Sequence, residues 1–203
     1  MKIFTFLEIV LFISFFPQLS FCQTAKEFAQ MGLLKSKSKD YPGALVDYNK
    51  SIQLDSSQEP VFYNRAIAKA KLNDIQGAIS DYSQAISLKS EPITFYNRAL
   101  MKIELKDYKG GLNDLNQAYE VKKSNSIFYF LRGNCKSVLK DFYAAIIDLN
   151  KAIELQPDNT KAYLVRGIVF MNIKEKEKSC YDFNKVKELG SKQADEFIFK
   201  YCK

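Results

Sequence analysis

One pattern of residues occurs five times along this chain of 203 residues, at intervals of 33 or 34 positions. Each copy contains an aspartate followed directly by an aromatic residue or leucine, and a small residue stands three positions before that aspartate. The five aspartates are Asp47, Asp81, Asp114, Asp148 and Asp182. An internal repeat of this length is typical of proteins that stack one supersecondary unit several times. The repeat therefore predicts a fold in which each unit packs on its neighbours.

Each copy is predicted to form two α-helices. Upstream of every aspartate an aromatic residue is followed four positions later by a small one, as in Phe62 and Ala66, which is the period of a helix face. An acidic residue stands between the two helices, where a carboxylate can cap the first turn of the second helix. These residues are Asp40, Asp74, Asp107, Asp141 and Glu175. The sequence therefore predicts an all-α chain of helix hairpins.

This pattern resembles the tetratricopeptide repeat (TPR) family, whose unit is a helix–turn–helix of about 34 residues. Tyr48, Tyr82 and Phe183 match the family's late aromatic position, and Pro157 matches its closing proline. The resemblance implies a right-handed α-solenoid of five TPR units. These units are expected at about 25–58, 59–91, 92–125, 126–159 and 160–190, followed by a capping helix at 191–202.

Residues 1–22 are predicted to be a signal peptide. Lys2 precedes an apolar run over residues 3–16, which is shorter than the roughly 20 residues that a spanning helix needs. The small residues Ser20 and Cys22 suit a cleavage site, so the mature chain is expected to cover 23–203. We therefore expect export to the bacterial periplasm or envelope, or secretion. Two alternatives remain. The first is a lipid anchor on Cys22, the one case in which we expect the membrane as a partner. The second is an uncleaved N-terminal anchor.

The composition argues against several functional classes. The chain has no histidine, which excludes catalytic triads and zinc sites that use imidazole. It also has no glycine-rich phosphate loop and no C-x-x-C pair. The net charge of +7 comes from scattered lysines, which do not form a basic stripe interleaved with aromatic residues. We therefore expect no enzyme activity, cofactor, metal, small-molecule substrate or nucleic-acid partner.

The resemblance implies that the first helices of the hairpins line a concave groove for a peptide or partner helix. The groove would be apolar and aromatic, with asparagine amides that can both donate to and accept from a peptide backbone. Its expected residues are Tyr63, Asn64, Ile67, Tyr96, Asn97, Leu100, Phe130, Leu131, Asn134, Leu164, Val165 and Ile168. The expected function is a protein- or peptide-binding scaffold of the cell envelope. Two alternatives stay open: these residues only pack the stack, or the protein is a structural subunit that uses its convex face or ends.

An arginine precedes the small residue of the first helix in four copies, at Arg65, Arg98, Arg132 and Arg166, whereas the first copy has Met31. These arginines could form an anion-binding ladder. They could instead pair with the repeated aspartates and fix the packing of successive hairpins. The matched recurrence of both partners favours the structural interpretation.

Two cysteines near the end of the chain are predicted to form a disulfide. The turn at Gly190 and Ser191 lies midway between Cys180 and Cys202, so antiparallel helices joined there bring both cysteines to one end. An exported chain is also in an oxidising compartment, and exported bacterial TPR proteins with a similar ending resemble this one. The alternative is two free thiols on a frayed tail. Cys135 is expected to be a buried thiol.

Overall fold

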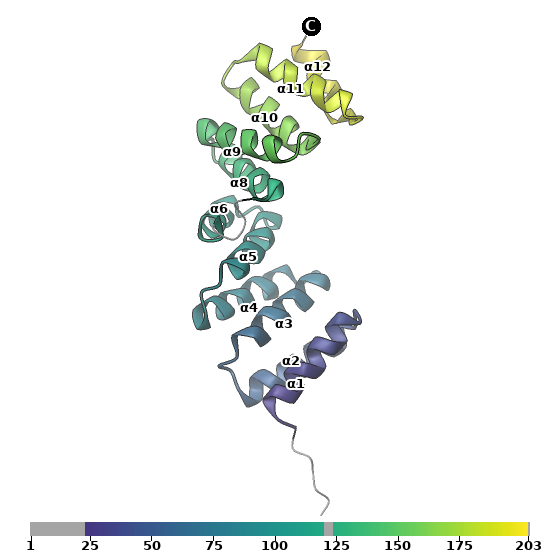
Figure 1. The fold of residues 1–203 in the computed structure, drawn as a ribbon, viewed down its shortest axis with the longest axis vertical. Helices are drawn as coiled ribbons and strands as arrows, with labels where there is room; N and C mark the ends of the chain where they lie inside the picture. Colours follow the sequence, from purple (N-terminus) through teal and green to yellow (C-terminus); the bar gives the residue numbers. More distant parts are fainter. Residues whose placement is uncertain (1–22, 120–123, 203) are drawn as a thin grey trace, which may run out of the picture.

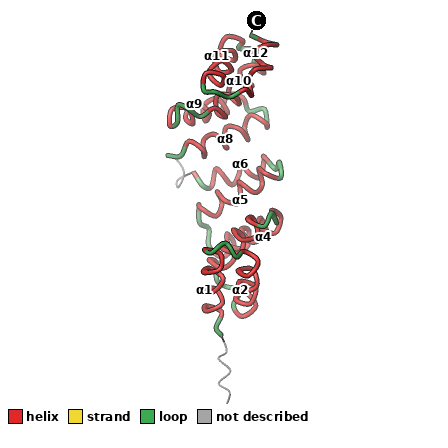
Figure 2. The backbone as a smooth tube through the Cα atoms, turned by 90° about the vertical axis from the view of Figure 1, so that its right-hand side faces the viewer, coloured by secondary structure: helices red, strands yellow, loops and turns green. Residues whose placement is uncertain are grey.

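The computed structural model describes residues 23–119 and 124–202 of the chain, and the predicted signal peptide lies outside the described residues. The described residues form helices and turns, with no strand. Figure 1 shows pairs of helices that follow one another along the long axis of the molecule. Seen from the side, the helices are joined mostly by short loops (Figure 2). The predicted all-α stack of helix pairs is therefore confirmed.

Five helix pairs and a C-terminal cap make up the described chain. Each helix packs mainly on its partner in the pair and on the helix before or after it in sequence. The pairs are α1 (Ala25–Lys37) with α2 (Tyr41–Leu54), α3 (Glu59–Lys71) with α4 (Ile75–Leu88), α5 (Pro92–Glu104) with α6 (Tyr108–Gln117), α8 (Ser126–Val138) with α9 (Phe142–Leu155), and α10 (Thr160–Asn172) with α11 (Lys176–Glu188).

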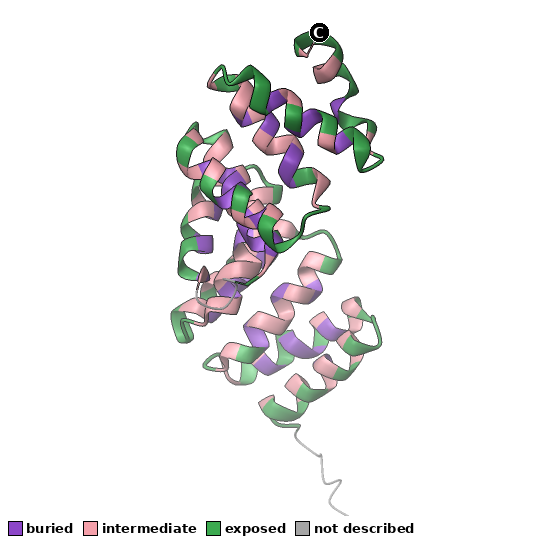
Figure 3. Cartoon of the chain, turned by 45° about the horizontal axis from the view of Figure 1, so that its top comes forward, coloured by how far each residue is buried: buried purple, intermediate pink, exposed green. Residues whose placement is uncertain are grey.

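Small residues on the first helix receive a large side chain from the second helix of the same pair. The Tyr48 ring lies against Gly32, where an added Cβ would be only 2.7 Å from the ring atoms. The Phe183 ring lies against Gly167 in the same way, also at 2.7 Å. Buried residues accordingly concentrate where the paired helices face each other (Figure 3). The repeated small residue of the first helix therefore contacts the repeated aromatic residue of the second helix.

The turn inside each pair has the same left-handed geometry. The residue before the acidic cap has a φ between 63° and 66° in all five pairs. These residues are Lys39, Asn73, Lys106, Lys140 and Lys174. Non-glycine residues rarely adopt this conformation, and lysine has no special tendency toward it. The sequence therefore contains little local signal for this turn.

The predicted aspartate caps form in three of the five pairs. Asp40, Asp74 and Asp107 each accept a hydrogen bond of 2.9 Å from the backbone N–H of a glycine three residues later. Asp141 and Glu175 make no side-chain cap bond, so the cap predicted at Asp141 is wrong. The glycines explain this difference, because a Cβ there would overlap the capping carboxylate, and Asp141 and Glu175 have alanine and lysine at that position.

The C-terminal cap differs in detail from the expected helix over 191–202. Gly190 has a φ of +83°, after which Lys192–Ala194 form a 3₁₀ turn (η2) and α12 covers only Asp195–Tyr201. The 3₁₀ turn brings Ala194 into a fully buried position beside Phe183. Phe197 of α12 then stacks on Phe183, with ring centroids 4.8 Å apart. The cap therefore covers the apolar end of the last pair.

The disulfide between Cys180 and Cys202 is present, with a Cα–Cα distance of 5.5 Å. It joins α11 to the end of α12, as the antiparallel arrangement of the two arms predicted. Cys135 is fully buried, and burial raises the pKa of its thiol to about 12. Within the described parts of the chain, no helix combines the length and apolar character needed to cross a bilayer.

Candidate functional site

The twelve residues expected to line a groove lie on the first helices α3, α5, α8 and α10, and all of them are half-buried. We call the surface formed by these twelve residues the first-helix face. Neighbouring first helices are connected across it, because the Asn97 side-chain amide donates a hydrogen bond of 2.9 Å to the Tyr63 hydroxyl. Burial raises the pKa of the Tyr63 and Tyr96 hydroxyls, so both remain protonated donors near neutral pH.

A pocket of about 410 Å³ opens on this face between α5, α8 and α10. Its apolar part contains three of the expected residues, Leu100, Phe130 and Leu131, together with Ile127. The side of the pocket is formed by residues 156 and 158–161, where the chain passes from the end of α9 into the start of α10. The pocket can therefore take an apolar group against its floor and offer polar groups at its rim.

Hydrogen bonds hold the rim of this pocket in place. Asn159 caps α10 by accepting a bond of 3.1 Å from the backbone N–H of Ala162. Its amide nitrogen donates to the Ser126 hydroxyl at 3.0 Å, and that hydroxyl donates to the Ala152 carbonyl at 2.8 Å. Three successive helices are thus connected beside the pocket, so its shape is set before any ligand arrives.

Most side chains of the first-helix face also pack the stack. Tyr63 lies edge-on against Tyr82, with centroids 5.9 Å apart, and Tyr96 and Phe130 pack on the large central core cluster. Leu164 and Ile168 pack on the C-terminal cluster. These side chains therefore contribute to the packing of the stack, and three residues of the face, Leu100, Phe130 and Leu131, line the pocket. Sequence reasoning missed Ile127, although its place three residues before Phe130 puts it on the same face of α8.

The arginines and aspartates form paired contacts within the fold. In each case the arginine Nε and one terminal nitrogen donate to the two carboxylate oxygens, at distances between 2.6 and 2.9 Å. The pairs are Arg65–Asp81, Arg98–Asp114, Arg132–Asp148 and Arg166–Asp182. This two-pronged geometry is the strong form of a charged hydrogen bond. The structural interpretation is therefore confirmed, but the expected pairing between successive hairpins is wrong, because each pair joins the two helices of one hairpin.

Three of the arginines also contact the preceding hairpin through their remaining terminal nitrogen. Arg65 donates to Asn49 at 2.7 Å, Arg98 to Ser83 at 2.9 Å, and Arg166 to the equivalent Asn150 at 2.6 Å. A lysine one turn after the arginine adds a second cation to the aspartate in three pairs. These lysines are Lys69, Lys102 and Lys136. With these donors engaged inside the fold, the arginines are not arranged to hold an external anion.

Two segments of the chain, residues 59–92 and 127–159, match the family model for the tetratricopeptide repeat. These two matched segments are of tetratricopeptide repeat type. The structure of the chain is similar to that of YrrB, described as a TPR protein with an unusual peptide-binding site, with a TM-score of 0.81 and 20% identity over 85% of this chain and 91% of YrrB. MamA from Desulfovibrio magneticus RS-1 gives a TM-score of 0.73 and 20% identity over 83% of this chain and 96% of that chain.

A second MamA structure has a TM-score of 0.75 and 17% identity, over 86% of this chain and 97% of that chain. At these identities the likeness is one of fold. A comparison with curated proteins found no match.

Proposed function

We propose that this protein binds a peptide segment of a partner protein on the first-helix face and does so without catalysing a reaction. The observation that carries the proposal is the pocket between α5, α8 and α10, because it combines an apolar floor with a fixed polar rim. Pockets that recognise one anchoring side chain have this composition. The description of YrrB as a peptide-binding TPR protein with a similar fold supports the same function.

The peptide would be held by an anchor and by its backbone. An apolar side chain of the peptide enters the pocket against Phe130 and Leu131. Asn64, Asn97 and Asn134 extend along the same face and offer amide groups to peptide N–H and C=O groups. Burial of the anchor supplies most of the affinity, and the amides set the orientation.

A specific observation favours a second candidate function, that of a structural subunit of an envelope assembly. Three large side chains on the second helices α9 and α11 are among the most exposed of the described apolar and aromatic residues. Tyr143 is 76%, Ile147 is 69% and Tyr181 is 63% exposed. A partner subunit could dock on this outer surface instead of on the first-helix face.

Two matched substitutions separate the candidates. Ile127 is 53% exposed in the pocket, and Ile147 is 69% exposed on α9, so both accept glutamate without loss of a buried contact. Peptides would be selected from a random library on the purified chain, and their affinity for each variant measured by fluorescence anisotropy. We expect Ile127→Glu to weaken binding at least about tenfold, which corresponds to about 1.4 kcal/mol, and Ile147→Glu to leave it unchanged. The reverse pattern would support the outer surface and contradict the proposal.

We also propose that the chain is exported, with removal of the signal peptide before Gln23. The Cys180–Cys202 disulfide supports this, because structural disulfides persist in oxidising compartments. The intact mass of the protein purified from its native cells tests the proposal. A chain that begins at Gln23 supports cleavage, one that begins at a diacylated Cys22 supports the lipid anchor, and an unprocessed chain contradicts both.

A further inference from the structure

Two opposite charges stand at the rim of the pocket between α5, α8 and α10, which we call the first-helix pocket. Asp158 is the one acidic residue and Lys161 the one basic residue among those that line it. Asp158 lies in the turn before α10, and Lys161 lies in the first turn of that helix. Both are exposed, and neither makes an ion pair or a side-chain hydrogen bond with another described residue. Each charge is therefore available to a ligand whose apolar group occupies the floor of the pocket.

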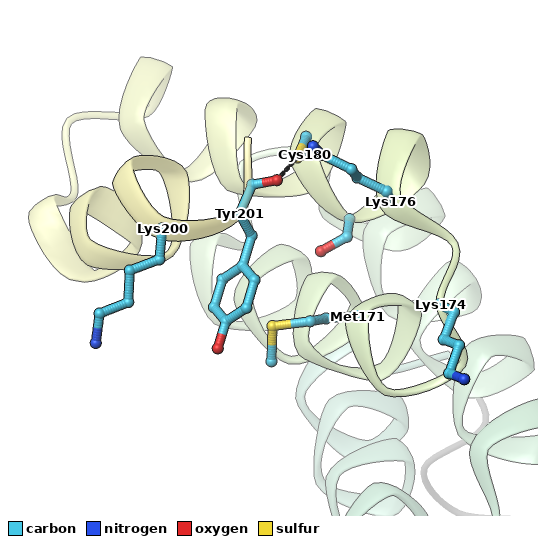
Figure 4. Close-up of a pocket in the computed structure, with 7 residues that line it drawn as sticks. Met171, Lys174, Lys176, Cys180, Lys200 and Tyr201 are labelled. Carbon is cyan, nitrogen blue, oxygen red and sulfur yellow. Dashed lines mark hydrogen bonds between the residues drawn. The ribbon is translucent and has the colours of Figure 1, made fainter. Parts of the chain in front are cut away.

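Charged side chains in comparable places are already engaged within the fold. Lys136 of α8 pairs with Asp148 at 2.7 Å. Lys200 lines another pocket, at the C-terminal end of the stack (Figure 4), but it pairs with Glu196 at 2.6 Å. The first-helix pocket differs from both settings, because it joins an apolar floor to two charges that the described part of the chain leaves without an ionic partner.

The repeat fold does not require these two charges. The preceding repeat has Ser124 and Ile127 at the places that Asp158 and Lys161 occupy, 34 residues earlier in each case. An asparagine caps the following helix in both repeats, so the helix begins in the same way with or without the charges. Stability of the repeat therefore does not explain the charges, whereas recognition of a charged ligand does.

We propose, resting on the peptide binding proposed above, that the first-helix pocket selects a peptide whose apolar anchor lies between two opposite charges. In an extended peptide, side chains two residues apart point to the same side. With the anchor in the pocket, an acidic residue on one side of it reaches Lys161 and a basic residue on the other side reaches Asp158. The asparagine amides of the face fix the direction of the peptide, so the order of the two charges is also recognised. Complementary charges of this kind contribute more to specificity than to affinity.

The order of the two charges in the peptide provides the test. Two peptides with blocked ends share one apolar anchor from the library selection. One has glutamate two residues before the anchor and lysine two residues after it, and the other has the reverse order. A third peptide has alanine at both places. Fluorescence anisotropy in low salt should show an affinity difference of about fivefold between the two charged peptides, as two exposed ion pairs allow. The difference should disappear near 1 M salt, where screening acts over about 3 Å.

Exchanging the two charges of the protein should reverse the preference. The variant Asp158→Lys/Lys161→Asp keeps the net charge and alters only exposed side chains, so the peptide that binds the unaltered chain more tightly should bind this variant more weakly. The control Lys151→Glu/Glu154→Lys exchanges the members of an ion pair that lines a different pocket, and it should leave the preference unchanged.

Charge selection and peptide binding fail in different ways. Equal affinities of the two charged peptides for the unaltered chain, or an unchanged preference in the exchanged variant, would overturn charge selection. Peptide binding in the pocket still stands in that case if Ile127→Glu weakens the alanine peptide, and it falls if Ile127→Glu has no effect on any of the three peptides. If circular dichroism shows that the exchanged variant folds poorly, Lys161→Gln decides. It should weaken the preferred charged peptide about twofold and spare the alanine peptide, whereas an equal effect on both would overturn charge selection.

Discussion

Thr94 is a buried polar residue at a position that three other repeats fill with apolar side chains. It lies fully buried in α5, and its hydroxyl has no hydrogen-bond partner among the described residues. The equivalent residues Val61, Phe128 and Ala162 are all buried. We expect Thr94→Val to raise the free energy of unfolding by about 1 kcal/mol, because valine has the same shape and removes an unsatisfied group. Denaturant unfolding measures this, with the half-exposed Thr160→Val as a control that should change little. A loss of stability would show that the hydroxyl has a partner, such as an ordered water.

Met31 stands in the first repeat at the position that holds an arginine in the other four repeats. Its repeat contains the buried Asp47, which pairs with Lys35 at 2.7 Å. In the other repeats an arginine at this place reaches the aspartate 16 residues later. We expect Met31→Arg to stabilise the chain by about 1 kcal/mol through the same two-pronged contact. The gain should vanish in an Asp47→Asn background, so a double-mutant cycle of denaturant curves identifies the cause. An equal gain in both backgrounds would rule the contact out.

The sequence could predict that the arginines pair with aspartates, but not which aspartate each arginine contacts. Recurrence of arginine and aspartate in every later repeat was enough to predict structural pairs. Arg65 lies 18 residues after Asp47 and 16 residues before Asp81, and these separations are too similar to choose between the two carboxylates. Only the packing of the helices decides, and it places the arginine of one helix against the aspartate of its own partner helix.

The turns within the helix pairs carry backbone strain that substitution can relieve. Lys106 has a φ of 63° between α5 and α6. Glycine adopts this conformation without the steric cost that a Cβ adds. We expect Lys106→Gly to raise the free energy of unfolding by up to about 1 kcal/mol, in line with substitutions that relieve left-handed strain. Lys109→Gly, three residues later but inside α6, should lower it by a similar amount. Thermal unfolding followed by circular dichroism compares the two, and destabilisation by both would contradict the strain argument.

Helix pairs were the most predictable elements, because their small and aromatic residues recur at the period of a helix. The turns and caps were less predictable. Lysine gives no sign of a left-handed conformation, and an acidic residue caps its helix here only when glycine follows three positions later. The C-terminal cap was placed correctly from Gly190 and Ser191, but its 3₁₀ beginning depends on the buried position of Ala194. Such details are set by contacts between elements.

Stacking also created the part of the candidate site that the sequence did not indicate. The first-helix face was expected from the resemblance to the TPR family, whose first helices line a groove. The rim of its pocket comes from the segment between α9 and α10, which contacts α8 only once the repeats are stacked. The pairing of Cys180 with Cys202, by contrast, follows from two arms of equal length about one turn.

The disulfide should stabilise one end of the molecule and leave the other end unaffected. Contacts along the stack are made mainly between neighbouring elements, so a local loss stays local. We expect Cys202→Ser to cost about 3 kcal/mol, the chain-entropy value for a loop of this size. Hydrogen exchange should show faster exchange in α12 and the end of α11, and unchanged exchange in α1 and α2. A uniform change along the chain, or none, would contradict this picture.

The same bond sets how far the molecule can be stretched. When a chain is pulled by its two ends, force passes through every backbone bond except those bypassed by a crosslink. Cys180 and Cys202 are 22 residues apart in sequence but 5.5 Å apart in space, so the intervening segment, including the η2 turn and α12, is shielded from tension. The oxidised protein is therefore about 70 Å shorter at full extension than the reduced one. Under load, the part of α11 after Cys180 keeps its cap while the helices before it extend.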